Sequence, residues 1–477
     1  MASVTRRTTT RLDHGCLSIQ LDRARRTSLA AQIYSTIREN IENGQLASGA
    51  RLPSWRDLAA QLGVSRGTVR VAYERLIAEH FAIGLGQAGT RVAERHWPPA
   101  MVGRSQEASL LPELFNEFGS PPLAFQMGVP SQDAFPFKLW SRMLTRETRQ
   151  VAPVTYPDPR GDPALRKEIA AYLGLARGVR CSASQVLITS GFSGALGLAI
   201  RGLQVGNREA WIEDPSFPLT RTALNLAGMR ATAVPVDSEG LNVAAGIETA
   251  AGASLAVVTP GQQAPLGMTM SLSRRLALLA WARRNDAWII EDDYLGELQL
   301  KGRAAPALAS LDHGGRVVHI GSFSKTISPS LRLVMVVPQD LVCRFGEIAA
   351  CLAPAPAAAA QRTVAEFLRQ GCYVRHLRRM KHLYAARRET LLHCLRETAS
   401  SLMKVQATAG LAVVIFLPDH VSDVDIALRA LHFGLAPAPL SPWYVQSPRQ
   451  QGLLLGVTNL NERRLLADCR RLSKSVR

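Results

Sequence analysis

Two hydrophobic patterns follow one another along the chain. Between Leu29 and Ile41 apolar residues recur every four positions, which predicts a helix capped by Ser28 and ended by Gly44. From Phe125 onward, short β-branched and apolar runs alternate with amphipathic stretches. Alternation of this kind predicts a mostly parallel sheet covered by helices. The chain is therefore expected to hold a small helical module followed by a large α/β domain.

Two more helices and a hairpin complete the predicted front module. Ser54 and Asp57 have the spacing of a capping box and begin a second helix, which ends in a tight turn at residues 62–64. Ser65 caps a third helix, and a helix–turn–helix arrangement of this kind lets its second helix enter the DNA major groove. Residues 81–93 predict a hairpin with a glycine-rich tip, which would serve as a wing. Generic packing of a helical hairpin is the alternative interpretation.

The run of residues 49–69 is more specific than the helix pattern alone. It reads Gly-Ala-Arg-Leu-Pro-Ser-Trp-Arg-Asp-Leu-Ala-Ala-Gln-Leu-Gly-Val-Ser-Arg-Gly-Thr-Val and resembles the hallmark of the GntR family of winged helix-turn-helix domains. The resemblance implies a DNA-binding domain over residues 28–93, in which Arg56 would hold phosphate and Arg66 and Arg70 would reach base edges or backbone. The expected DNA-binding residues are Arg56, Ser65, Arg66, Thr68 and Arg70.

Composition and charge agree with a nucleic-acid partner. The 477 residues suit two or three domains, and the formal charge of +18 favours a polyanionic partner. Seven cysteines without CxxC pairing indicate reduced thiols, as in a cytosolic protein. The N-terminus lacks the apolar core of a secretory signal, and no apolar run is long enough to span a membrane. We therefore expect a cytoplasmic protein that makes no membrane contact.

A linker separates the two predicted domains. Residues 94–122 contain Pro-Pro, Gly, Ser and scattered charge without periodicity, which is typical of a linker. The large domain is expected over residues 123–477, with shorter strands and helices after residue 361 forming a smaller C-terminal part. Its strands are expected at residues 186–189, 210–213, 231–234, 255–258, 287–290, 317–320 and 333–336.

Lys325 is the most informative residue of the large domain. It follows the strand at residues 317–320 in a hydroxyl-rich turn with Ser322 and Ser324, and Arg332 comes seven residues later. Open α/β sheets bind ligands at the carboxyl ends of their strands. The hydroxyls and Arg332 could grip a phosphate while the lysine amine meets an aldehyde, which suits pyridoxal 5′-phosphate held as a lysine Schiff base. A solvated surface lysine is the simpler alternative.

Other strand ends carry groups that suit the same cofactor. Residues 190–196 follow a strand and open a helix, whose amide groups could bind phosphate. Phe217 follows the next strand and could stack on a pyridine ring, although a core role fits it as well. Glu291-Asp-Asp-Tyr294 follows an apolar run, and buried acids are costly unless something positive meets them. One of the acids could keep a pyridine nitrogen protonated; a metal site is the competing interpretation, but no cluster of His or Cys supports it.

In this order the motifs resemble fold-type I pyridoxal-phosphate aminotransferases over roughly residues 123–472. With the GntR-like front, the whole chain resembles the MocR-type regulators, in which a winged helix is fused to an aminotransferase-like domain. The implied fold class is α/β, with an N-terminal winged helix-turn-helix and a large domain built on a mostly parallel sheet.

The resemblance implies a role for each cofactor residue. Lys325 would form the Schiff base and Asp292 would meet the pyridine nitrogen, with Asp293 as the alternative to Asp292. Tyr156 would reach the phosphate of a partner subunit, which implies a head-to-tail homodimer. The full set of expected cofactor residues is Lys325, Asp292, Tyr294 (3-oxygen), Phe217 (ring face), Ser193, Ser322, Ser324 and Arg332 (phosphate) and Tyr156.

Two departures from the aminotransferase pattern bear on activity. Residues 259–267 read Thr-Pro-Gly-Gln-Gln-Ala-Pro-Leu-Gly, without the Asn that such enzymes usually carry beside a Pro-Thr-Gly turn. Residues 452–456 read Gly-Leu-Leu-Leu-Gly where aminotransferases place an Arg that clamps the substrate carboxylate. Transamination is therefore not expected.

The leading hypothesis is a transcriptional regulator that binds an operator in double-stranded DNA. Its large domain would bind pyridoxal phosphate and sense the cofactor or a small effector. One alternative is an active aminotransferase with an accessory DNA-binding domain. Another is a relative that binds DNA and has lost the cofactor.

Overall fold

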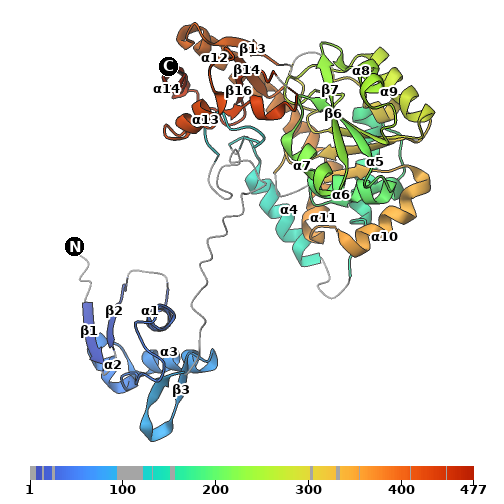
Figure 1. Ribbon diagram of the computed structural model, residues 1–477. Helices are drawn as coiled ribbons and strands as arrows, with labels where there is room; N and C mark the ends of the chain where they lie inside the picture. The colour runs from blue at the N-terminus through green and yellow to red at the C-terminus, as the bar shows by residue number, and fades with distance from the viewer. Residues whose placement is uncertain are drawn as a thin grey trace. The chain divides into compact units, whose positions relative to one another are not determined.

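The computed structural model describes residues 7–12, 15–23, 27–93, 122–131, 133–150, 156–300, 304–328, 333–353, 355–408, 410–446 and 448–476. The chain divides into two compact units, Met1–Ala108 and Ser109–Arg477 (Figure 1). Of the predicted linker, residues 94–122, only Pro122 lies within the described residues.

The first unit contains the three predicted helices and the wing. The elements are α1 (Leu29–Glu42), α2 (Trp55–Leu62), α3 (Arg66–Ala78), β3 (Ala82–Gly84) and β4 (Thr90–Val92). The side chains of Ser28, Ser54 and Ser65 each accept a hydrogen bond from a backbone N–H in the first turn of the helix that follows. β3 and β4 pair antiparallel, as the hairpin pattern predicted. One apolar core joins all three helices to the wing.

An N-terminal hairpin also belongs to this unit. β1 (Arg7–Leu12) pairs antiparallel with β2 (Gly15–Gln20). Ile19 on β2 is buried in the same core as the α1 residue Ile33. The sequence pattern predicts a unit that begins at Ser28 and does not predict these strands, because their Thr- and Arg-rich residues show little apolar periodicity.

The second unit is built on an eight-stranded sheet of order β5-β12-β11-β10-β9-β6-β7-β8. β7, β6, β9, β10 and β11 run parallel, and β12 pairs antiparallel with both β11 and β5. The strands are β5 (Val186–Thr189), β6 (Glu209–Asp214), β7 (Arg230–Asp237), β8 (Gly240–Leu241), β9 (Leu255–Val258), β10 (Trp288–Asp293), β11 (Val317–Ser322) and β12 (Leu333–Val336). Every strand predicted for the large domain is present, so the mostly parallel sheet is confirmed.

Helices cover both faces of this sheet (Figure 1). Ile290 of β10 packs into one buried cluster with α6 and α10, while its neighbour Ile289 packs into another with α8 and α9. Alternate residues of one strand thus serve two cores, as expected when helices lie on both faces. The helices are α5 (Pro163–Arg177), α6 (Phe192–Leu203), α7 (Pro218–Leu226), α8 (Val243–Ala250), α9 (Leu272–Arg284) and α10 (Val342–Leu352).

A smaller four-stranded antiparallel sheet, ordered β13-β14-β16-β15, forms the C-terminal part. Its strands are β13 (Lys404–Ala407), β14 (Ala412–Phe416), β15 (Ala438–Pro439) and β16 (Gly452–Gly456). The remaining helices are α4 (Phe137–Gln150), α11 (Ala358–Arg369), α12 (Cys372–Thr398), α13 (Asp423–Leu431) and α14 (Leu465–Ser475). Among the described residues, no helix is both long and apolar enough to cross a membrane.

Candidate cofactor and DNA-binding sites

Lys325 lies in the turn that follows β11, at the carboxyl edge of the parallel strands. Its Nζ donates a hydrogen bond of 2.8 Å to the backbone oxygen of Gly128. Gly128 has a φ of +80°, a conformation that residues with a side chain rarely adopt, and a Cβ built there would lie 2.7 Å from the lysine Nζ. Desolvation lowers the pKa of Lys325, opposed by the charge of Asp292. A lysine with a lowered pKa is more often in its nucleophilic, uncharged form.

The hydroxyl-rich turn around the lysine is compact. The side-chain oxygen of Ser322 accepts a 3.1 Å hydrogen bond from the backbone N–H of Ser324, and both residues are half-buried. Arg332, the predicted phosphate partner, lies outside the described residues.

The three acids of β10 are held in different ways. Glu291 accepts hydrogen bonds from the backbone N–H groups of Leu308 (2.6 Å) and Ala309 (2.9 Å), and its Oε2 lies 3.0 Å from Nδ1 of His319. Asp293 accepts two hydrogen bonds from the guanidinium of Arg177, at 2.6 and 3.0 Å. Glu291 and Asp293 thus each have partners of their own.

Asp292 points to the other side of the strand from its two neighbours, as the two-residue period of a strand requires. Among the described residues its carboxylate has neither an ion pair nor a hydrogen bond. Desolvation, with the charge of Asp293, raises the pKa of Asp292 to about 8, while nearby Lys325 acts in the opposite direction. Burial also raises the pKa of Tyr294, which follows β10. The acid facing the lysine is therefore Asp292.

Two other predicted residues follow neighbouring strands. Phe217 lies between β6 and α7, half-buried, with its ring centroid 5.7 Å from that of Trp443. Ser193 is the second residue of α6, and its side chain is exposed at the helix N-terminus. Gly191, which precedes α6, has a φ of +114°. Free backbone N–H groups at such a helix end can bind an anion.

Tyr156 stands apart from this group. Its side chain is fully exposed on the single chain, at 102 %. Four residues later the chain is anchored to the sheet, because the N–H of Ile188 donates a 2.8 Å hydrogen bond to the oxygen of Arg160. Gly161 has a φ of +107° and packs so closely on Ile188 that no Cβ would fit.

Sequence reasoning missed several residues that shape this site. Gly128, Arg177, His319 and Trp443 come from four separate parts of the chain. Arg177 lies 116 residues before the Asp293 that it binds, so no local pattern connects them. The groups of acids and hydroxyls could be found from sequence because each follows a recognisable strand, whereas their partners could not.

Residues 452–456, which lack the Arg that aminotransferases place there, form the fully buried strand β16. Leu453 and Leu455 face the helices of the C-terminal part. Leu454 faces the other way and packs with Val414 and Leu440. No cation occurs on this strand.

The predicted DNA-binding residues lie at the start of α2 and of α3. Arg56, Ser65, Arg66 and Arg70 are exposed, and Thr68 is half-buried. Ser65 is committed to the helix cap, since its oxygen accepts from the N–H of Thr68 and lies 2.8 Å from the Thr68 hydroxyl. Arg70 pairs with Glu74 one turn later at 2.9 Å, on the surface. The first turn of α3 therefore presents Arg66 to the solvent.

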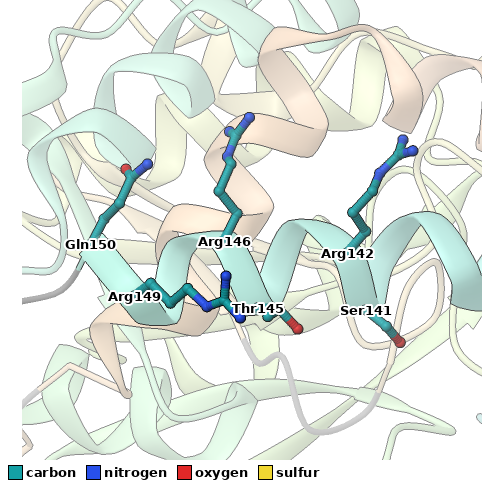
Figure 2. A pocket seen from close by; sticks show the side chains of 6 residues that line it. All are labelled: Ser141, Arg142, Thr145, Arg146, Arg149 and Gln150. Atoms are coloured by element: carbon teal, nitrogen blue, oxygen red, sulfur yellow. The ribbon is translucent and has the colours of Figure 1, made fainter.

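A shallow recess lies elsewhere on the second unit, on α4. Its lining is Ser141, Arg142, Thr145, Arg146, Arg149 and Gln150. Arg142 and Arg146 extend from one side of the helix and Ser141 from the other (Figure 2). Arg146 is paired with Glu147 at 2.8 Å and with Glu366 at 3.1 Å. None of the predicted cofactor residues lines this recess. Among the described residues no group of acids, histidines and cysteines could hold a metal ion.

Comparison with known proteins matches both units. Residues 29–92 match the bacterial regulatory proteins of the gntR family, and residues 138–431 match aminotransferase class I and II. The probable rhizopine catabolism regulatory protein MocR of Rhizobium meliloti is 35% identical over 92% of each chain. The chain belongs to the MocR-type transcriptional regulators. The winged helix-turn-helix and the aminotransferase-like fold expected from sequence are both confirmed.

Other MocR-type relatives are regulators as well. The HTH-type transcriptional regulator TauR of Rhodobacter capsulatus is 33% identical, over 86% of this chain and 89% of its own. The HTH-type pyridoxine biosynthesis transcriptional regulator PdxR of Corynebacterium glutamicum is 30% identical, over 94% of this chain and 95% of its own. Such names favour a regulator over an enzyme with an accessory domain.

Solved structures resemble the second unit. An archaeal alanine:glyoxylate aminotransferase superposes with a TM-score of 0.69 and 26% identity, over 75% of this chain and 91% of its own. The α-aminoadipate aminotransferase LysN from Thermus thermophilus, complexed with N-(5′-phosphopyridoxyl)-L-leucine, superposes with a TM-score of 0.67 and 26% identity, over 74% of this chain and 92% of its own. The large unit of this MocR-type chain thus has the aminotransferase fold.

Proposed function

We propose that this MocR-type regulator binds an operator through residues 28–93 and pyridoxal 5′-phosphate through residues 123–477. Occupancy of the site at Lys325 would then set how the protein binds DNA. The observation that carries the proposal is that Lys325 and Asp292 lie close enough for their charges to influence one another. This proximity places an amine with a lowered pKa near an acid that has no partner among the described residues.

The residues present fit this cofactor. Lys325, Asp292, Tyr294 and Phe217 are all half-buried rather than sealed in the core, so a ligand can reach them. A desolvated acid without a partner is unfavourable, and a pyridine nitrogen would supply the missing partner of Asp292. Asp293 is less suited to that role because both of its oxygens are bound to Arg177.

Each residue has a definite task in the proposal. Asp292, with a pKa of about 8, carries a proton at neutral pH that a pyridine nitrogen can share. The Tyr294 hydroxyl would donate to the ring's 3-oxygen, and the Phe217 ring would cover one face. Ser193, Ser322, Ser324 and Arg332 would hold the phosphate, assisted by the N-terminus of α6. Bound there, the cofactor supplies an aldehyde carbon that reacts with amines.

The phosphate site would be completed by a second copy of the chain. Tyr156 lies four residues before the point where Arg160 is hydrogen-bonded to the sheet, and its side chain is fully exposed. In a head-to-tail homodimer, its hydroxyl would reach the phosphate held by the partner subunit.

DNA binding would rest on α3. Arg66 and Arg70 would reach base edges or backbone, while Arg56, Ser65 and Thr68 would fix the helix against the phosphates. The Arg70–Glu74 pair is exposed and therefore weak, so Arg70 can exchange Glu74 for DNA at little cost.

The segment at residues 122–131 offers a route from the cofactor site toward the linker. Gly128 accepts the hydrogen bond from Lys325, and the N–H of Gly456 on β16 donates to the oxygen of Phe125 at 2.8 Å. A Lys325 Nζ bonded to the cofactor would have fewer protons to donate than the free amine, so its hydrogen bond to Gly128 would change. The proposal is that this change alters the start of the large unit and, through the linker, the placement of the two winged units in the dimer.

The cofactor assignment is tested by absorbance and chemical trapping. Wild-type protein given the cofactor and freed of excess should show an absorbance band of lysine-bound cofactor, and borohydride should fix the label on Lys325. Lys325→Ala should lose the band, whereas Lys167→Ala, on the exposed surface of α5, should keep it. A wild type without the band, or a Lys325→Ala variant with it, would refute the assignment.

An active aminotransferase is the second candidate, favoured by the fold alone. The apolar strand β16 argues against it, because it offers no cation for a substrate carboxylate. Steady-state transamination at roughly 1 per second or faster would support that candidate instead.

A further inference from the structure

One face of the long helix α12 contacts the turn that carries Lys325. The Tyr373 hydroxyl lies 3.1 Å from the Thr326 hydroxyl, and the rings of Phe323 and Tyr373 meet edge to face with centroids 5.3 Å apart. One turn further along the helix, Nε2 of His376 lies 2.8 Å from the backbone oxygen of Thr326. A carbonyl oxygen only accepts, so this ring nitrogen is the donor. The residue next to Lys325 is therefore held by two buried side chains of α12.

The same face of α12 contacts the start of the large unit. Residues 122–131, which begin at the last residue of the predicted linker, are called the entry segment. The Tyr384 hydroxyl accepts a 2.8 Å hydrogen bond from the N–H of Ser131, and Arg387 donates to the Ser131 hydroxyl at 2.9 Å. A spacing of three or four positions places the buried contact residues on one side of the helix: Tyr373, His376, Met380, Tyr384 and Arg387.

The helix thus links two regions that also touch each other directly. Gly128 of the entry segment accepts the hydrogen bond from Lys325. The Lys325 turn and the entry segment are both bound to α12, which is 27 residues long. A shift of the turn would either move the helix with it or break buried hydrogen bonds, and leaving such groups without partners is unfavourable.

We propose that α12 transmits the state of the Lys325 turn to the entry segment, with Tyr373 and His376 as the positioning residues that make the helix follow the turn. The inference rests on the proposed function and names the route by which cofactor occupancy would reach the linker. Tyr373 and His376 act through Thr326. Cofactor binding itself should therefore survive their substitution, while its effect on DNA binding should not.

The carboxylate of Glu297 provides a matched control. The Tyr373 hydroxyl donates to Glu297 at 2.9 Å, and the hydroxyl of Tyr172 on α5 is hydrogen-bonded to the same carboxylate. Tyr373→Phe removes a partner from both Glu297 and Thr326. Tyr172→Phe removes a partner from Glu297 alone and leaves the Lys325 turn unchanged. Thr326→Val removes the hydroxyl on the turn and leaves Glu297 unchanged.

The test compares the response of operator affinity to the cofactor. Full-length wild type and each variant are titrated with an operator fragment, with and without pyridoxal phosphate. The fold-change caused by the cofactor should be smaller than in wild type by a factor of about 2–30 in Tyr373→Phe and in Thr326→Val, the usual size of such effects on coupling. The double variant should respond like Tyr373→Phe alone, because both changes break the same contact. Tyr172→Phe should keep the wild-type fold-change.

Two further readouts distinguish transmission from a general loss of structure. In every variant the absorbance band of the lysine-bound cofactor should match that of the wild type. Operator affinity without the cofactor should also be unchanged. His376→Phe, which removes the donor to Thr326 and keeps an aromatic ring, should reduce the fold-change in the same way as Tyr373→Phe.

The outcomes separate the inference from the proposed function. A wild type whose operator affinity ignores the cofactor refutes the proposed function and the inference with it. A coupled wild type whose fold-change persists in Tyr373→Phe and Thr326→Val refutes the inference alone. An equal loss in Tyr172→Phe does so too, because the effect would then come from Glu297, and so does a folded Tyr373→Phe that lacks the cofactor band. If Tyr373→Phe does not fold, Thr326→Val and Tyr172→Phe decide the matter.

Discussion

Asp292 and Asp293 are neighbours in the sequence but lie in different environments. Asp293 is held by Arg177 through two hydrogen bonds, whereas Asp292 faces Lys325 and has a pKa raised to about 8. The sequence could place an acid at this strand end but could not choose between the two, because the choice depends on an arginine from α5. At the scale of single residues, the environments of the two acids predict opposite consequences of substitution.

In the cofactor-free protein, Asp292 should make stability fall as pH rises. Its folded pKa of about 8 lies above the ordinary value of about 3.9, so the folded state binds the extra proton between these limits. Its contribution is most favourable below pH 4 and is lost progressively up to about pH 8. Thermal unfolding of the apo-protein measures this. The stability of Asp292→Asn relative to wild type should be greater at pH 8 than at pH 5.

Asp293→Asn is the matched control for that measurement. It leaves the buried guanidinium of Arg177 with a weaker partner, and breaking a buried pair of this kind costs on the order of 3–5 kcal/mol. That loss should be present at both pH values. If Asp292→Asn shows no pH-dependent difference from wild type, the account of Asp292 is wrong.

At the scale of elements, the predictions succeeded where a segment carries its own pattern. Seven of the eight strands of the large sheet and the helices after Ser28, Ser54 and Ser65 were predicted, because apolar runs and caps are local signals. The hairpin β1–β2 was missed because its polar strands show no such signal. The hydrogen bond between Lys325 and Gly128 was also missed, since it joins residues 197 positions apart.

The face of α3 that meets DNA should be identifiable by substitution. Arg66→Ala and Arg70→Ala should each weaken operator binding by about 1–3 kcal/mol, while cofactor absorbance is unchanged. Arg75→Ala is the control on the same helix: Arg75 lies over the Tyr34 ring at 3.9 Å and faces α1 instead. Binding is measured by fluorescence anisotropy over a range of salt, since affinity should fall steeply as counterions are released. If all three variants bound the operator as tightly as the wild type, this face of α3 would be excluded as the DNA-binding surface.

At the scale of the whole molecule, the proposed sites require two copies of the chain. Mixed dimers of Lys325→Ala and Tyr156→Phe subunits test this. If Tyr156 acts across the interface, each heterodimer has one site with both changes and one intact site. Cofactor affinity in the mixture should then include a wild-type component that neither parent shows. The absence of this component, or a monomer by light scattering at high concentration, would rule out the head-to-tail arrangement.

In the proposed function one molecule couples cofactor binding to DNA binding, and operator affinity measures that coupling most directly. An operator fragment taken from a genome-wide occupancy map is titrated with wild-type protein and with Lys325→Ala, each with and without pyridoxal phosphate. The wild-type affinity should change by about 5–150-fold on adding the cofactor, the usual range for coupled sites. The Lys325→Ala affinity should not change. A wild-type affinity that is indifferent to the cofactor, or a variant that responds as the wild type does, would contradict the account.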